Sequence, residues 1–250
     1  MPTPPTGASR APPAAISAHR GGGEMAPQGT YAAYQSALAA GADYLEFDVR
    51  RTADGELVAF HPARLGRGRP VGGLSYAELC RLAGYEVPTT SGVLRLLAGR
   101  AAAHIDLKEQ DCLAAIVPQA LSVLAPEQII VTTGDEVAIS ELRKRHPGVP
   151  AGLTIGGDLE RTAGLLAWLA SRLVRSRIDA VVAAGAGWAV MHERLARIGG
   201  LAECRRRGLA TMVWTVNDDT ALARWLGCAD VDILVTDRPR RAADLRRQAP

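Results

Sequence analysis

Aromatic side chains, paired cysteines and long apolar runs are scarce in this sequence, and each absence excludes a class of protein. Aromatic residues make up 4% of the 250 residues, and the 29 basic side chains are scattered among 26 acidic ones. Nucleic-acid binders usually gather basic and aromatic side chains on one face. We therefore expect no nucleic-acid partner.

No stretch approaches the roughly 18 apolar residues that a membrane span requires, so we expect no span. The cysteines show neither metal-binding nor redox spacing; they are Cys80, Cys112, Cys204 and Cys228. Separate thiols are typical of a reducing compartment. Residues 1–13 lack the charged and apolar regions of a signal peptide and predict a short disordered arm. These features together predict a cytoplasmic location.

The sequence does contain a regular alternation of short β-rich runs and longer amphipathic runs. Eight strands are expected near Ala15–Ala18, Tyr44–Val49, Ala102–Leu107, Gln128–Thr132, Ala151–Ile155, Ala180–Ala183, Thr211–Val216 and Ile233–Thr236. Helices are expected between them, for example over Thr30–Ala40, Cys112–Leu124, Val137–Arg145, Leu159–Leu173, Glu193–Arg207 and Thr220–Leu226. Eight such repeats in a chain of this length predict one α/β domain over residues 14–250, a closed (β/α)8 TIM barrel.

A doubly wound sheet is the alternative to the barrel. Gly21-Gly22-Gly23 follows the first strand but lacks the G-x-G-x-x-G spacing of a dinucleotide site, which disfavours that alternative.

Residues from about 56 to 74 interrupt the alternation of strands and helices with a short strand, Leu57–Phe60, and a loop rich in Gly, Arg and Pro. We interpret this segment as a small insertion above the barrel mouth.

Polar residues at the carboxyl ends of the strands are the candidates for a site, because TIM barrels place their active sites there. Four strand ends carry them: His19-Arg20-Gly21, Glu46-Phe47-Asp48, Asp106-Leu107-Lys108 and Trp214-Thr215-Val216-Asn217. Alternate side chains of a strand share a face, so Glu46 and Asp48 point the same way. Unpaired buried carboxylates are costly, and a hard divalent cation such as Mg²⁺ or Ca²⁺ offsets that cost. The pattern favours a metal site formed by Glu46, Asp48 and Asp106.

Two histidines flank this acidic group. His19 directly follows the first strand, and His61 follows the short strand of the insertion. Imidazole titrates near neutral pH, so the two fit general acid–base work. His104 is expected to be a hydrogen-bonded core residue, while His146 and His192 are expected at helix ends or on the surface.

Taken together, the motifs resemble the glycerophosphodiester phosphodiesterase family, which shares its barrel with the phospholipase D toxins. The matching pieces, in order, are Ala18-His19-Arg20-Gly21, Pro27-Gln28-Gly29-Thr30, Gly41 to Val49, Thr52 to Gly55 leading to His61, Pro88-Thr89, Ile105 to Lys108, Trp214 to Asn217, and Thr236 to Pro239. The resemblance implies that His19 and His61 are the acid–base pair. It further implies a metal held by Glu46, Asp48 and Asp106.

The resemblance also implies roles for substrate-binding residues. Arg20 and Lys108 would contact the phosphate of a small-molecule phosphodiester, Trp214 would wall the pocket, and Asn217 is a weaker candidate for a polar contact. The chain departs from the family pattern at Gln28-Gly29, where Glu-Asn is usual, and at Pro62, where Asp is usual. We expect phosphodiester chemistry to be retained with a shifted substrate.

Two other functions remain open from the sequence. One is a metal-dependent lyase, or an aldolase that uses Lys108 as a Schiff base. The other is a barrel that has lost catalysis and binds a phosphorylated ligand.

Overall fold

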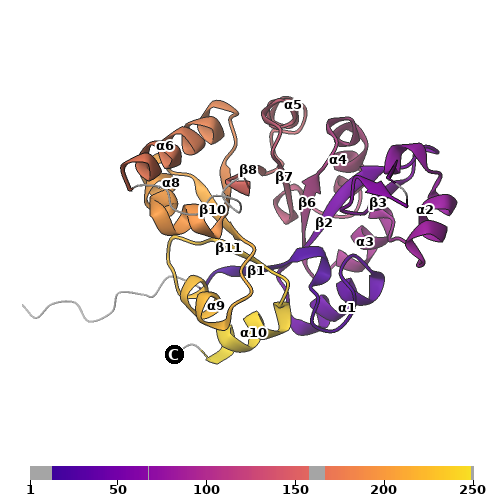
Figure 1. Cartoon of the computed structure of the whole chain (residues 1–250), viewed down its shortest axis with the longest axis horizontal. Helices are drawn as coiled ribbons and strands as arrows, with labels where there is room; N and C mark the ends of the chain where they lie inside the picture. Colours follow the sequence, from indigo (N-terminus) through magenta and orange to yellow (C-terminus); the bar gives the residue numbers. More distant parts are fainter. Residues whose placement is uncertain (1–12, 67, 158–166, 249–250) are drawn as a thin grey trace, which may run out of the picture.

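A closed ring of parallel strands surrounded by helices forms the core of the molecule (Figure 1). The computed structural model describes residues 13–66, 68–157 and 167–248. The expected arm over residues 1–13 therefore lies almost wholly outside the described residues.

Eight parallel strands make up the ring: β1 (Ala15–Ala18), β2 (Tyr44–Arg51), β6 (Ala102–Leu107), β7 (Ile129–Thr133), β8 (Ala151–Ile155), β9 (Trp188–His192), β10 (Ala210–Trp214) and β11 (Ile233–Thr236). Each pairs with the next in this order, and β11 pairs with β1. Pairing of β1 with β2, with Ser17 opposite Tyr44, closes the circle. The TIM barrel predicted from the sequence is confirmed.

Each barrel strand is followed by helical structure before the next strand begins. The helices are α1 (Tyr31–Ala40), α2 (Tyr76–Ala83), α3 (Thr90–Leu97), α4 (Leu113–Leu121), α5 (Glu136–Arg145), α6 (Ala167–Ala183), α7 (Glu193–Leu195), α8 (Leu201–Arg207), α9 (Asp219–Leu226) and α10 (Pro239–Gln248). Side-chain caps fix several helix starts: Thr30, Asp135 and Asp218 accept backbone N–H groups of α1, α5 and α9. No described helix is both long enough and apolar enough to cross a membrane.

The expected sixth strand at Ala180–Ala183 is wrong. These residues end α6, and the strand is β9, Trp188–His192. A four-residue apolar run does not distinguish a strand from a buried helix turn. The burial of Val174, Ile178 and Val181 recurs at helical spacing against the core. The first part of the helix expected over 159–173 falls on residues 158–166, outside the described residues.

The expected insertion after β2 is present and supplies an extra antiparallel strand. β3 (Leu57–Ala59) pairs with the end of β2, where Val49 lies opposite Ala59. The short strands β4 (Arg64–Leu65) and β5 (Arg69–Pro70) form a separate pair beyond it. The backbone N–H of Phe60 donates to the carbonyl of Asp48, 2.9 Å away. This bond holds the following residue, His61, at the level of the β2 strand end.

Gly21 illustrates how closely the first strand end approaches α1. Its φ is +78°, and a Cβ atom there would lie 2.7 Å from the backbone nitrogen of Tyr34. We expect Gly21→Ala to lower the free energy of unfolding by about 2–4 kcal/mol, because left-handed strain and a backbone clash add. Urea denaturation measures it. Gly41→Ala is the control, since Gly41 has φ +86° with open space around it; equal losses for both variants would contradict the clash.

Candidate active site

The inner face of neighbouring strands brings the predicted carboxylates together. Strand register places Asp48 of β2 opposite Asp106 of β6. Glu46 is 3% exposed and Asp48 is 2% exposed. One oxygen from each of Glu46, Asp48 and Asp106 lies within 4.8 Å of the other two. The convergence predicted from strand ends is therefore present.

Two cations and one backbone amide contact this group of acids. Lys108 Nζ lies 2.9 Å from Asp48 Oδ1 and 2.5 Å from Asp106 Oδ2. Arg20 Nε lies 2.9 Å from Asp48 Oδ2, and the Arg20 backbone N–H donates to Glu46 Oε2 over 2.7 Å. Arg20 adopts a left-handed φ of 51°, uncommon for a residue with a side chain. That conformation directs both its backbone and its guanidinium at the acids.

The contacts leave a negative and partly unsatisfied centre. Asp48 Oδ1 and Arg20 Nε are fully buried, and neither makes a hydrogen bond of good geometry despite the short ion-pair distances. Burial and the neighbouring Asp48 carboxylate raise the pKa of Glu46 to about 8. Burial also raises the pKa of Asp106, an effect that Lys108 only partly offsets. Such a site is stabilised by added positive charge.

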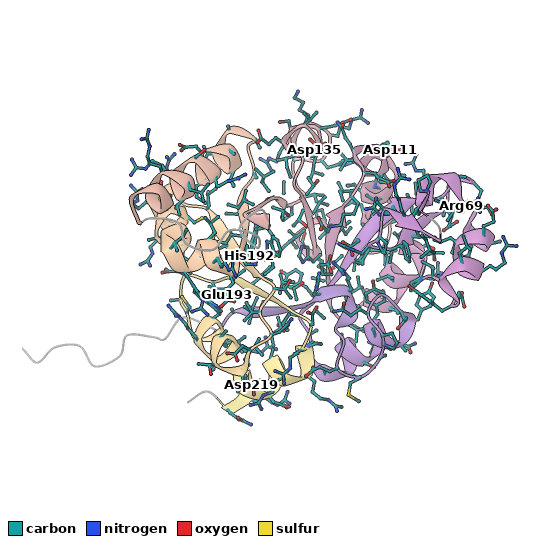
Figure 2. All side chains as sticks on the ribbon, in the orientation of Figure 1. Arg69, Asp111, Asp135, His192, Glu193 and Asp219 are labelled. Carbon is teal, nitrogen blue, oxygen red and sulfur yellow. The ribbon has the colours of Figure 1, made fainter. Side chains whose placement is uncertain are left out.

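These residues fit a divalent cation. Three carboxylates offer hard oxygen ligands, and the orphaned Asp48 oxygen is available for coordination. A second acidic group, Glu109, Asp111 and Cys112, is less suited. The Glu109 carboxylate is already engaged by Arg50 at 2.8 Å. Asp111 lies toward the outer edge of the molecule (Figure 2).

His19 is held by a carboxylate that the strand-end analysis did not assign. Its Nδ1–H donates to Asp237 Oδ1 over 2.6 Å, just after β11. Asn217 Nδ2 and Gln28 Nε2 donate to the same carboxylate at 2.6 and 2.5 Å. Burial lowers the pKa of His19, but the bond to Asp237 and the charge of Glu46 outweigh it, so the pKa is raised overall. Nδ1 is thus committed, and Nε2 is left for substrate.

His61 faces the same acids from the insertion. Its side chain is exposed, in contrast to the partly buried His19. Burial lowers the pKa of His61, the Asp48 carboxylate raises it, and the positive charges of Arg20 and Lys108 lower it further. The resulting pKa lies below the usual value. The two imidazoles therefore carry pKa values displaced in opposite directions.

A cavity of about 400 Å³ joins most of the predicted residues. Its lining includes both histidines, the three acids, Arg20, Lys108 and Trp214. The Trp214 ring packs edge-on against His192, with ring centroids 5.2 Å apart. His192, labelled in Figure 2, is the last residue of β9, and its side chain caps the start of α7. The expected position at a helix end is confirmed. Thr132 and Thr154 also line the cavity and were not singled out from the sequence.

Asn217, expected at the substrate, does not line the cavity, whereas His104, expected in the core, is buried and contributes to the lining. Asn217 is absent from the cavity lining and instead positions Asp237, whose backbone N–H also donates to Asn217 Oδ1 over 2.9 Å. His104 is buried as expected, between Ser17 at 3.0 Å and Thr132 at 3.1 Å. Burial lowers its pKa to about 3, which keeps it neutral.

The sequence profile of the glycerophosphoryl diester phosphodiesterase family matches residues 19–241. The chain belongs to this family. It is 26% identical to YhdW of Bacillus subtilis over 242 residues, which is 90% of this chain and 94% of that protein. A crystal structure of a glycerophosphodiester phosphodiesterase from Agrobacterium tumefaciens is 28% identical, with a TM-score of 0.71 and coverage of 92% and 99% of the two chains.

A further solved structure shares the fold. It is an Oleispira antarctica phosphodiesterase in complex with the product sn-glycerol-3-phosphate, with a TM-score of 0.74, 19% identity and coverage of 93% and 96%. Family membership makes this chain a phosphoric diester hydrolase with glycerophosphodiester phosphodiesterase activity. The lyase and binding-only alternatives therefore give way to hydrolysis. Lys108 agrees with this outcome, because its two carboxylate partners raise its pKa and disfavour the neutral amine of a Schiff base.

Proposed function

We propose that this phosphodiesterase cleaves a glycerophosphodiester by metal-assisted acid–base catalysis, with His19 as the acid and His61 as the base. The observation that carries the assignment is that both imidazoles line one cavity with the three acids, with Nδ1 of His19 held by Asp237. The pKa of His19 is raised and that of His61 is lowered. Groups whose environments push their pKa values apart are suited to opposite proton-transfer roles. The raised pKa of His19 favours its protonated form, and the lowered pKa of His61 favours its neutral form.

The substrate phosphate would bind between the acidic centre and the two cations. Arg20 and Lys108 place a guanidinium and an ammonium at the cavity floor, where they offset charge on the phosphate oxygens. Glu46, Asp48 and Asp106 would hold Mg²⁺ or Ca²⁺, which when bound supplies further stabilisation of that charge. His61 then removes a proton from water or a substrate hydroxyl. His19 delivers its Nε2 proton to the departing alcohol.

A screen of phosphodiesters tests the proposal. We expect ³¹P NMR to show conversion of glycerophospho-alcohols to a phosphomonoester or cyclic phosphate with Mg²⁺ or Ca²⁺, and no conversion with EDTA. Turnover that persists unchanged in EDTA would refute metal dependence. Product spectra would also distinguish attack by water from attack by a neighbouring hydroxyl.

Replacing the partner of His19 is expected to shift the pH profile. The wild-type profile should be a bell, rising as His61 loses its proton and falling as His19 does. In Asp237→Asn the negative charge that raises the His19 pKa is gone, so the falling limb should move to lower pH. We expect kcat on the falling limb to drop about tenfold, as for a pKa lowered by about one unit, with the rising limb unmoved. An unchanged falling limb at saturating metal would show that Asp237 does not act through His19.

A further inference from the structure

A second cavity adjoins the active site on the side of the insertion. It has a volume of about 220 Å³ and shares Arg20, Asp48 and His61 with the first cavity. The rest of its wall is formed by the side chains or backbone of Gln28, Gly29, Tyr34, Ala59, Phe60, Pro62 and Tyr85. Arg20, a proposed phosphate contact, thus lies at the junction of two cavities. A phosphodiester has two alcohol arms, so each arm could enter one of them.

Tyr34 gives the second cavity an unsatisfied polar group. Its side chain is 1% exposed and comes from α1. No described residue hydrogen-bonds to its hydroxyl. The hydroxyl is not sealed within the core, since the fully buried side-chain atoms without a partner in the described chain are Arg20 Nε and Asp48 Oδ1. An accessible hydroxyl without a protein partner can pair with a hydroxyl of a bound ligand in place of water.

Charge and size restrict what the cavity can hold. Arg20 and His61 line the cavity, and Asp48, which also lines it, is ion-paired with Arg20 and Lys108. A cationic arm would meet the guanidinium and leave the tyrosine hydroxyl unpaired, because a quaternary ammonium has no hydrogen-bonding atom. A volume of about 220 Å³ leaves room for a short alcohol.

We propose that this cavity is a subsite for an uncharged, hydroxyl-bearing alcohol of the diester, such as a glycerol or another small polyol, recognised by the Tyr34 hydroxyl. The inference rests on the phosphodiesterase function and adds which second alcohol the enzyme selects. Gly29 lines the same cavity, and a Cβ atom there would meet nothing within 4 Å, so a side chain can be introduced at this position without a clash.

Two variants probe the subsite independently. Tyr34→Phe removes only the hydroxyl and should lower kcat/KM for glycerophosphoglycerol about 3- to 10-fold, as expected for one hydrogen bond. Its effect on bis(4-nitrophenyl) phosphate, whose arms carry no hydroxyl, should be clearly smaller. Gly29→Asn narrows the cavity with a residue that tolerates the left-handed region and should also lower kcat/KM for glycerophosphoglycerol several-fold. Tyr44→Phe, at the opposite end of β2, is the matched control and should behave like the wild type.

The substrate comparison decides the outcome. We expect the wild type to prefer glycerophosphoglycerol to glycerophosphocholine, and Tyr34→Phe to narrow that preference. Equal losses on all diesters, or no loss in either cavity variant, would overturn the subsite while leaving the hydrolase assignment intact. A preference for the choline ester would overturn the stated ligand class. Absence of cleavage of every diester by the wild type would overturn the proposed function and the subsite together.

Discussion

His19→Ala and His61→Ala are each expected to lower kcat for glycerophosphoglycerol by about a hundredfold or more, the usual contribution of a positioned acid or base. An alkoxide is a poor leaving group, so it needs the His19 proton. A 4-nitrophenolate departs without one. For bis(4-nitrophenyl) phosphate we therefore expect His19→Ala to retain most activity and His61→Ala to lose it.

His146→Ala serves as the control for these variants. His146 ends α5 and lines neither cavity, so its removal should leave both substrates unaffected. If His61→Ala instead retained activity on bis(4-nitrophenyl) phosphate and His19→Ala lost it, His61 would be the acid and His19 the base. Near-normal turnover of glycerophosphoglycerol in both variants would refute the acid–base pair.

Asp48→Asn is expected to lower kcat by about two to three orders of magnitude, equivalent to several kcal/mol of lost transition-state stabilisation. Asp48 is the acid that contacts both cations, at 2.9 Å from each. The neutral amide leaves the guanidinium and ammonium without their shared counter-ion and removes one carboxylate from the metal group. Steady-state assays over a range of Mg²⁺ concentrations measure the loss of both kcat and apparent metal affinity.

The control for Asp48→Asn is Asp111→Asn, in the second acidic group. Its side chain is 68% exposed, so the change should affect neither folding nor turnover. Thermal denaturation of both variants separates lost catalysis from lost structure. A folded Asp48→Asn protein with wild-type kcat and wild-type metal dependence would contradict the assigned role of Asp48.

The alternation of short β-rich runs and longer amphipathic runs was sufficient to predict most of the barrel. Strands such as β2 and β6 contain alternating outward apolar and inward polar residues, and register then brings Asp48 opposite Asp106. The prediction failed for the sixth strand, because two apolar runs lie close together there, at Ala180–Ala183 and Trp188–His192. Composition favours neither run, because the helical burial of Ile178 and Val181 depends on tertiary packing.

The candidate site was predictable where a residue directly follows a strand, and less so where contacts join distant segments. Asp237 follows β11 and could have been found by the same strand-end argument, but its bond to His19 spans 218 positions. Asn217 was expected at the substrate and instead positions Asp237. Tyr34 carries no sequence signal at all, because a tyrosine on the buried face of a helix ordinarily predicts core packing.

The proposed mechanism requires Glu46, Asp48 and Asp106 to bind one cation beside both imidazoles. Anomalous diffraction from crystals grown with Mn²⁺ tests it most directly. We predict one strong peak at about 2.0–2.6 Å from an oxygen of each of the three carboxylates. A peak confined to Glu109 and Asp111, or no peak at saturating Mn²⁺, would contradict it.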